Sequence, residues 1–192
     1  MTGCQVMAKP ASSCCNLDCR HCFYNDTAYL SVVVNRQNSQ WPEPLYQQLR
    51  QSGASLLQFI PLVERDERGM LTAESVEPQV WGTFLTAVFD IWVREDIGRV
   101  HIRLFDIVLN VWCGYSRYEE KTAVSPDCQR CTVFRFCHGD CPKHHDERGK
   151  SVLCAGYSEF IHYTAPHMRV MRDLIRQHRS PTELMAMLRA EC

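Results

Sequence analysis

The sequence contains no long apolar run, no excess of charge of either sign and no recognisable leader segment. No stretch approaches the roughly 18 consecutive apolar residues of a membrane-spanning helix. The 21 basic and 22 acidic side chains give a net charge of -1, which removes the electrostatic basis for a dedicated nucleic-acid or membrane-surface partner. The first ten residues lack the charged and apolar regions of a secretory signal. We therefore expect a cytoplasmic protein with no nucleic-acid partner and no membrane partner.

Cysteine, in contrast, is abundant, with 12 among 192 residues. In the cytoplasm thiols are kept reduced, so clustered cysteines bind metals or do chemistry more often than they form disulfides. Most of these cysteines lie in two dense groups. This uneven placement predicts two metal centres rather than a disulfide framework.

The first group is a compact trio, Cys15, Cys19 and Cys22. An ordinary iron–sulfur cluster takes four cysteines, so three close thiolates suit a cluster whose fourth iron stays open for a small molecule. An irregular zinc site that includes His21 is an alternative, although His21 is adjacent to Cys22 and both could not easily bind one ion. A trio that starts at Cys14 also agrees with the spacing.

The second group follows the pattern Cys-X2-Cys-X5-Cys-X3-Cys, with one further cysteine downstream: Cys128, Cys131, Cys137, Cys141 and Cys154. The opening Cys-X2-Cys alone is typical of zinc, so a zinc knuckle made of the first four cysteines, or of three and a nearby histidine, is an alternative to an iron–sulfur cluster. We interpret the neighbouring histidines as solvated loop residues rather than ligands: His138, His144 and His145.

The first group lies in a segment that carries a family resemblance, Ala8-Lys-Pro-Ala-Ser-Ser-Cys-Cys15-Asn-Leu-Asp-Cys19-Arg-His-Cys22-Phe-Tyr24. It resembles the cluster loop of radical S-adenosylmethionine (SAM) enzymes, specifically of the anaerobic sulfatase-maturating enzymes. The resemblance implies that Cys15, Cys19 and Cys22 hold a [4Fe-4S] cluster and that SAM chelates its fourth iron. It also implies that Tyr24 binds the cofactor beside the SAM adenine.

The second group is similar to SPASM, a C-terminal extension that carries auxiliary clusters in radical SAM enzymes that modify peptides and proteins. This resemblance implies that an auxiliary [4Fe-4S] cluster is held by Cys128, Cys131, Cys137 and Cys154. Cys141 would belong to another auxiliary cluster, for which upstream cysteines are missing. Asp140 stands where a second glycine is usual and His145 where arginine is usual, which suggests relaxed constraint in this motif.

Local patterns predict an α/β fold. A β-branched strand at 31–35, a helix at 42–51 and a strand at 56–61 make one parallel βαβ unit. Aromatic residues at helical spacing predict a core-facing helix over 78–96, followed by strand-like residues at 100–103. Ser180-Pro-Thr-Glu183 forms a capping box that opens the last helix.

The resemblance implies that this fold is the remnant of a radical SAM partial (β/α) barrel followed by a small cysteine-rich SPASM-type α+β domain. The expected segments are 1–66 for the cluster loop and the last part of the barrel, 67–112 for a connector, 113–165 for the auxiliary-cluster domain and 166–192 for C-terminal helices.

The chain is too short for the complete barrel. Only 41 residues separate Cys22 from Glu64, whereas six βα units need on the order of 190 residues. The resemblance jumps near Leu30, and the Gly-Gly-Glu-Pro motif that binds the SAM amino group is absent. A second jump, between Trp112 and Glu119, removes the upstream auxiliary-cluster cysteines and the aspartate proposed as general base, so no catalytic residue is assigned.

Membership of this family implies an oxidoreductase that uses a 5′-deoxyadenosyl radical to convert a cysteine or serine of a sulfatase to Cα-formylglycine. Its partners would be the sulfatase polypeptide and an electron donor such as flavodoxin or ferredoxin. The cofactor supplies the difficult chemistry and the protein supplies orientation and shielding, so we expect this shortened chain to turn over weakly or not at all. The alternative is a non-catalytic iron–sulfur or zinc-binding remnant of such an enzyme.

Overall fold

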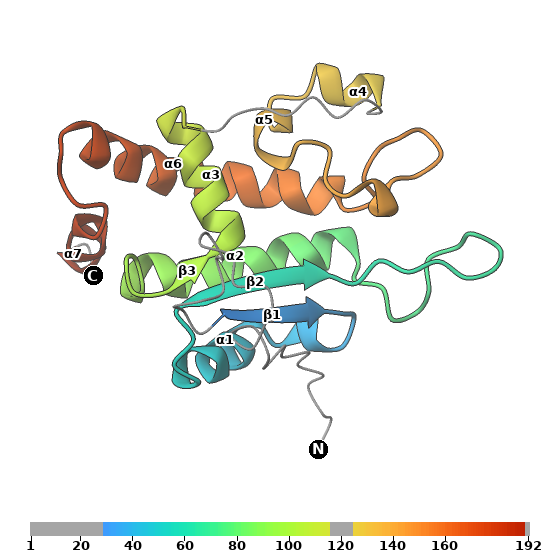
Figure 1. Ribbon diagram of the computed structural model, residues 1–192, viewed down its shortest axis with the longest axis horizontal. Helices are drawn as coiled ribbons and strands as arrows, with labels where there is room; N and C mark the ends of the chain where they lie inside the picture. The colour runs from blue at the N-terminus through green and yellow to red at the C-terminus, as the bar shows by residue number, and fades with distance from the viewer. Residues whose placement is uncertain (1–28, 116–124, 191–192) are drawn as a thin grey trace, which may run out of the picture.

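A three-stranded parallel sheet and a set of helices make up the computed structural model, which describes residues 29–115 and 125–190 (Figure 1). The elements in chain order are β1 (Tyr29–Val34), η1 (Asn38–Gln40), α1 (Pro42–Gln51), β2 (Leu56–Pro61), α2 (Pro78–Glu95), β3 (His101–Ile102), α3 (Arg103–Cys113), α4 (Pro126–Gln129), α5 (Phe134–Cys137), η2 (Pro142–His144), α6 (Cys154–Arg176) and α7 (Glu183–Ala190). None of the helices in these two ranges combines the length and the apolar character needed to cross a membrane.

The predicted βαβ unit is confirmed. β1 and β2 pair in parallel, with Tyr29 opposite Leu56, and α1 makes the crossover between them. Proline at the first position of α1 suits the helix start, because its fixed φ is already helical and its missing N–H would have had no partner there. Gly53, at φ +77°, turns the chain back toward β2. β3 extends the sheet on the other side of β2, but it is only two residues long because α3 begins at once.

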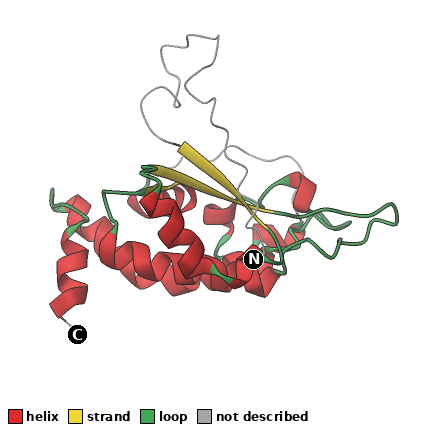
Figure 2. Cartoon of the chain, turned by 90° about the horizontal axis from the view of Figure 1, so that it is seen from below, coloured by secondary structure: helices red, strands yellow, loops and turns green. Residues whose placement is uncertain are grey.

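The long helices lie on one side of the sheet (Figure 2). Val32, Val34 and Leu57 point to that side and are fully buried in the core. On the alternate positions of the strands, Ser31 donates a 2.8 Å hydrogen bond to the Tyr29 hydroxyl, which donates to the Gln58 side chain. Parallel sheets usually have both faces covered, so a sheet with its long helices on one side is the arrangement expected of part of a barrel.

The expected core-facing helix is α2, and its aromatic stripe is buried as predicted. Phe89 is fully buried and makes edge-to-face contacts with Phe105 of α3 and Phe160 of α6, at centroid distances of 5.4 and 6.2 Å. Trp92 donates its indole N–H to the Val100 carbonyl at 2.7 Å. These contacts join α2 and α3 to α6 in one core.

α2 and α6 cross where both helices carry glycine. A Cβ on Gly156 would lie 2.0 Å from the carbonyl oxygen of Pro78, and a Cβ on Gly82 would lie 2.9 Å from the Gly156 Cα. The two backbones can approach this closely only because neither residue has a side chain. The boundary expected between residues 165 and 166 falls inside α6, and the division into domains stays a prediction.

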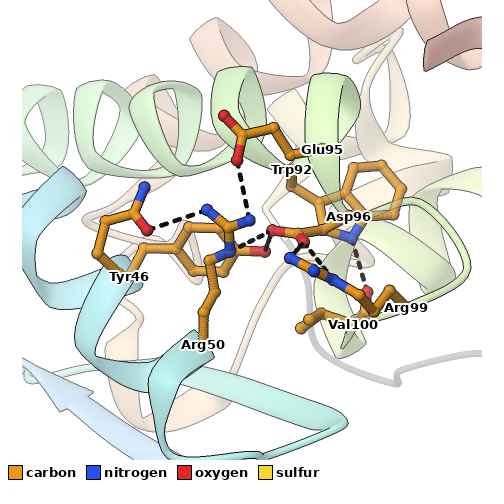
Figure 3. A network of polar contacts seen from close by, with 8 residues as sticks. Tyr46, Arg50, Trp92, Glu95, Asp96, Arg99 and Val100 are labelled. Atoms are coloured by element: carbon orange, nitrogen blue, oxygen red, sulfur yellow. Dashed lines mark hydrogen bonds and ion pairs between the residues drawn. The ribbon is translucent and has the colours of Figure 1, made fainter. Parts of the chain in front are cut away.

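A buried carboxylate fastens α1 to the end of α2 (Figure 3). The Asp96 side chain is 0% exposed and accepts a 2.8 Å hydrogen bond from the Tyr46 hydroxyl and a 2.9 Å contact from Arg50 Nε. Arg99 also donates to this carboxylate, and Arg50 reaches Glu95 at 2.8 Å. Burial, together with the hydrogen bond to Asp96, raises the pKa of Tyr46 well above its ordinary value, so its hydroxyl stays a donor.

We expect Asp96→Ala to lower the free energy of unfolding by about 3–5 kcal/mol, because Arg50, with a side chain only 15% exposed, would lose its buried partner and the buried Tyr46 hydroxyl would lose its acceptor. Glu95→Ala is the matched control, since it removes the other partner of Arg50, whose side chain is 49% exposed. That exposed pair should contribute less than about 1 kcal/mol. Urea unfolding of the two variants checks the difference, and equal losses would contradict the role assigned to Asp96.

Candidate metal centre

Helix ends and tight turns place the four cysteines that were expected to hold the auxiliary cluster. Cys128 lies in α4, which Ser125 caps by accepting the N–H of Asp127. The N–H of Cys131 donates to the carbonyl of Cys128 at 3.1 Å. Downstream, Cys137 is the last residue of α5 and Cys154 is the first residue of α6.

These thiols lie close enough to influence one another's protonation. Burial raises the pKa of Cys128, and the neighbouring Cys154 and Cys131 raise it further. Burial raises the pKa of Cys137 to about 11; the backbone N–H of Gly139 opposes this, while the other three thiols add to it. The pKa of Cys154 is likewise raised by burial and by Cys131, against an opposing effect of Lys150. Four thiolates here would repel one another, so a positively charged metal or cluster is the counterion that such a site suits.

The arrangement does not converge on the position of a single ion. Within residues 29–115 and 125–190, no three His, Cys, Asp or Glu side chains form a group that could hold one metal ion. A tetrahedral zinc with bonds of about 2.3 Å would need sulfurs about 3.8 Å apart. Cys141 is exposed at the start of η2 and contributes to none of the pKa shifts of the other four cysteines.

The other predicted ligands lie outside the described residues. Cys15, Cys19 and Cys22, the proposed ligands of the SAM-binding cluster, and Tyr24, the proposed contact of the SAM adenine, all precede residue 29. Their roles stay predictions.

Asp140 is a functional feature of this motif that sequence reasoning missed. Its φ of +62° is the left-handed conformation that favours glycine and that aspartate tolerates. Its carboxylate accepts hydrogen bonds from Ser151 Oγ at 2.8 Å and Tyr157 Oη at 3.2 Å and lies 2.8 Å from His144 Nδ1. Burial alone would raise the pKa of Asp140, but these bonds and the Cys141 N–H hold it below its usual range. Aspartate in place of glycine thus adds a buried link between the cysteine loop and α6. It is not a sign of relaxed constraint.

The expectation that His144 is solvated was wrong, because this side chain is only 8% exposed and lies against Asp140. His145 is half-buried: its Nε2 lies 2.5 Å from the Gly139 carbonyl, and its own carbonyl accepts from Arg65 at 3.1 Å. His138 caps α5 at φ +48°. These contacts show that the three histidines hold the conformation of the loop. The sequence pattern alone could not reveal these contacts.

We expect Asp140→Ala to cost about 2–4 kcal/mol of stability, because it leaves buried hydroxyl and imidazole groups without their acceptor. Asp140→Gly removes the same bonds but suits the left-handed backbone, so its loss should be smaller by about 1 kcal/mol. Urea unfolding of both variants separates the two contributions. A neutral Asp140→Ala would contradict the role of the carboxylate, and identical losses would contradict the role of the backbone.

Several known proteins are similar to this chain in sequence. No family model matches the sequence. The chain is 49% identical over 158 residues to "Uncharacterized protein YidF" of Escherichia coli, an alignment that covers 82% of this chain and 91% of YidF. It is 25% identical over 234 residues to a serine-type anaerobic sulfatase-maturating enzyme of Bacteroides thetaiotaomicron, covering 82% of this chain and 56% of that enzyme. The chain therefore spans about half the length of the maturases that it matches.

The fold is similar to that of a solved maturase. The structure "Native anSMEcpe with bound AdoMet" superimposes with a TM-score of 0.59 at 19% identity, covering 76% of this chain and 56% of that one. The same protein solved with bound AdoMet and a Kp18Cys peptide gives a TM-score of 0.60 at 20% identity, covering 76% of this chain and 57% of that one. The chain therefore shares with these solved structures an α/β fold that contains a small parallel sheet. The chain is thus related to the anaerobic sulfatase-maturating enzymes and corresponds to a shortened form of them.

Proposed function

We propose that this chain is a radical SAM iron–sulfur oxidoreductase of sulfatase maturation, and that it oxidises a cysteine or serine side chain of a sulfatase to Cα-formylglycine. The observation that carries the proposal is the gathering of Cys128, Cys131, Cys137 and Cys154, from three separate elements and one turn, within electrostatic reach of one another. These cysteines lie on a chain whose fold is that of the maturases.

The residues present fit an auxiliary [4Fe-4S] cluster. Four thiols match the ligand number of a closed cubane, whereas no three His, Cys, Asp or Glu side chains of the described residues form a group that could hold one ion such as zinc. The Gly139 N–H points to the Cys137 sulfur, and such bonds tune cluster potentials. In this proposal Cys128, Cys131, Cys137 and Cys154 form a SPASM-type site, and the exposed Cys141 lacks the partners for a further cluster.

The SAM-binding half of the proposal rests on Cys15, Cys19, Cys22 and Tyr24. These three cysteines would hold the cluster that binds SAM, and the chemistry supplied there would be a 5′-deoxyadenosyl radical able to take a Cβ hydrogen from the substrate. The contribution of the protein is to hold the peptide and exclude water. Proposed partners are a sulfatase polypeptide and a protein electron donor, and the proposed location is the cytoplasm. The peptide-bound anSMEcpe structure supports a peptide substrate.

The type of sulfatase target is left open in this proposal. Relatives of the chain include enzymes named serine-type and one named cysteine-type, from Clostridium novyi, which is 34% identical over 87 residues and covers 43% of this chain. An assay therefore has to offer both a cysteine and a serine substrate peptide.

A second candidate function, a non-catalytic cluster-binding protein, is favoured by one observation. Only 41 residues separate Cys22 from Glu64, whereas a partial barrel of six βα units needs on the order of 190. A radical held in so shortened a barrel would meet solvent or protein before substrate. For this reason we expect weak or no turnover by the isolated chain.

Anaerobic reconstitution with iron and sulfide, followed by metal analysis and a SAM-binding titration, tests the proposal. About eight irons per chain, at four per cubane, together with SAM binding support it, whereas bound zinc without SAM binding would contradict it. Incubation of the reconstituted protein with SAM, a reductant and cysteine or serine sulfatase peptides then separates the two candidates. Formylglycine supports the oxidoreductase, and its absence in a fully loaded protein supports the cluster-binding protein.

A further inference from the structure

Three arginines gather around Trp112 near the end of α3, and a fourth acts on the neighbouring Cys113. The guanidinium carbons of Arg135, Arg169 and Arg172 lie 5.0, 5.9 and 5.8 Å from the centre of an indole ring. Burial raises the pKa of the adjacent Cys113, and the charges of Arg172 and Arg176 oppose this rise. We call Arg135, Arg169, Arg172 and Arg176 the arginine cluster.

The positive charge of this cluster is poorly compensated. Arg169, Arg172 and Arg176 follow one another at spacings of three and four on α6, where like charges disfavour the helix. Arg172 pairs with Asp173 at 2.8 Å, but within the described ranges no carboxylate forms an ion pair with the other three. In contrast to these three arginines, Arg179, which lies beyond the end of the same helix, is paired with Glu183.

The arginine cluster is open to a partner and rests on a rigid base. Arg135, Arg169 and Arg176 are exposed, and Arg172 is partly exposed. The Trp112 ring packs against Phe136 at a centroid distance of 5.3 Å, and Phe136 is 4% exposed. Three guanidinium groups lie over the Trp112 ring, and the buried Phe136 holds that ring in place. These guanidinium groups are therefore pre-organised to meet several carboxylates at once.

The cluster also adjoins the cysteines of the metal centre. Arg135 stands between Cys131 and Cys137 in the chain, and its guanidinium lies over the Phe136 ring at 4.6 Å. A protein seated on the arginine cluster would therefore approach the proposed auxiliary cluster from its Cys137 side.

We propose that the arginine cluster is the docking surface for a small acidic electron-carrier protein that reduces the auxiliary cluster. This inference rests on the proposed function, because it assigns a partner to the same metal centre. One electron passes from the reduced carrier to the cluster; the carrier is oxidised, the cluster is reduced by one electron, and no proton moves and no bond is broken. Charge complementarity identifies the partner, since among the described residues four arginines stand against one paired carboxylate, which selects an acidic surface.

The test compares two double variants that lose the same charge. Arg169→Gln/Arg176→Gln removes two exposed members of the arginine cluster, and glutamine keeps the helix propensity of α6. Arg36→Gln/Arg68→Gln removes two exposed arginines from the loops after β1 and β2. Each reconstituted protein is mixed anaerobically with a reduced plant-type [2Fe-2S] ferredoxin as the acidic probe, and the rate of electron transfer is followed over a range of salt concentrations.

We expect electron transfer at low ionic strength to slow about five- to tenfold in the arginine-cluster variant and to become less sensitive to salt, because docking loses two charged contacts. The control variant should match the wild type. Equal rates in all three proteins would overturn the proposal, as would tighter binding of a single-stranded RNA than of ferredoxin to the wild type.

Two further measurements separate this inference from the proposed function. Chemical reduction by dithionite shows whether each protein contains a reducible cluster. A loaded wild type that dithionite reduces but ferredoxin does not would overturn the docking surface and leave the proposed function standing. A protein that binds ferredoxin in a salt-dependent way but holds no iron would overturn the proposed function and the electron transfer with it.

Discussion

Replacing Gly156 by alanine is expected to be the most damaging single change in the core of this protein. The new Cβ would lie 2.0 Å from the Pro78 carbonyl oxygen and 2.9 Å from the Gly82 nitrogen. Both atoms belong to the backbone of α2, so no side-chain rotation can relieve the overlap. α2 and α6 would have to move apart, which would loosen the contact between Phe89 and Phe160.

The higher helix propensity of alanine over glycine stabilises the variant by at most about 1 kcal/mol, whereas overpacking against a fixed backbone destabilises it by about 3 kcal/mol or more. We therefore expect a clear net loss in the free energy of unfolding. Gly82→Ala is the graded comparison: its Cβ would meet atoms at 2.9 to 3.0 Å, one of them in the flexible Glu159 side chain, so its loss should be smaller. Urea unfolding of both variants gives the order, and a Gly156→Ala protein as stable as the wild type would contradict this packing.

The same substitution bears on the metal centre because Gly156 is two residues from Cys154. A displaced α6 carries its first residue away from the other three cysteines. We therefore expect the Gly156→Ala variant to bind less iron after reconstitution, even in the fraction that remains folded.

The elements that the sequence predicted well are those that short segments specify. The βαβ unit follows from β-branched runs around a proline-started helix, and its bounds at Pro42–Gln51 and Leu56–Pro61 agree with the expectation. The aromatic stripe of α2 was correctly assigned to the core. A period of two or 3.6 residues is a local property, so no tertiary information is needed to read it.

The features that the sequence could not give depend on residues distant in the chain. In the sequence, Gly82 and Gly156 are isolated glycines 74 residues apart, and only the structure shows that their backbones are in contact. From the sequence, Asp140 was interpreted as a lost glycine, because the hydroxyls that donate to its carboxylate belong to Ser151 and Tyr157, 11 and 17 residues away. Trp112 gave no sign that arginines from α5 and α6 would meet over its ring.

The short form of the chain is a shared property. The alignment with the Bacteroides thetaiotaomicron enzyme extends over 234 residues, more than the 192 residues of this chain, so parts of that enzyme have no counterpart here. The alignment with YidF covers 91% of YidF, so that protein is a chain of similar length. Two proteins that are 49% identical over 158 residues therefore share the same abbreviated length.

Removal of single cysteines is expected to give the largest effect on metal content. From a wild type with about eight irons, alanine at any one of four positions should remove about four irons, because an incomplete ligand set does not hold a cubane. These positions are Cys128, Cys131, Cys137 and Cys154. Alanine at Cys15, Cys19 or Cys22 should remove the other four irons and abolish SAM binding as well. Cys113→Ala is the control that should leave both unchanged.

Two of these variants decide between an iron–sulfur cluster and a zinc knuckle. A knuckle would use Cys141 and leave Cys154 aside, whereas the auxiliary cluster uses Cys154 and leaves Cys141 without partners. Cys154 lies within electrostatic reach of Cys128 and Cys137, and Cys141 does not contribute to either pKa. We therefore expect Cys154→Ala to lose metal and Cys141→Ala to keep it. The reverse pattern, with zinc in the wild type, would refute the auxiliary cluster, because a tetrahedral ion has no use for a fifth thiolate at the start of α6.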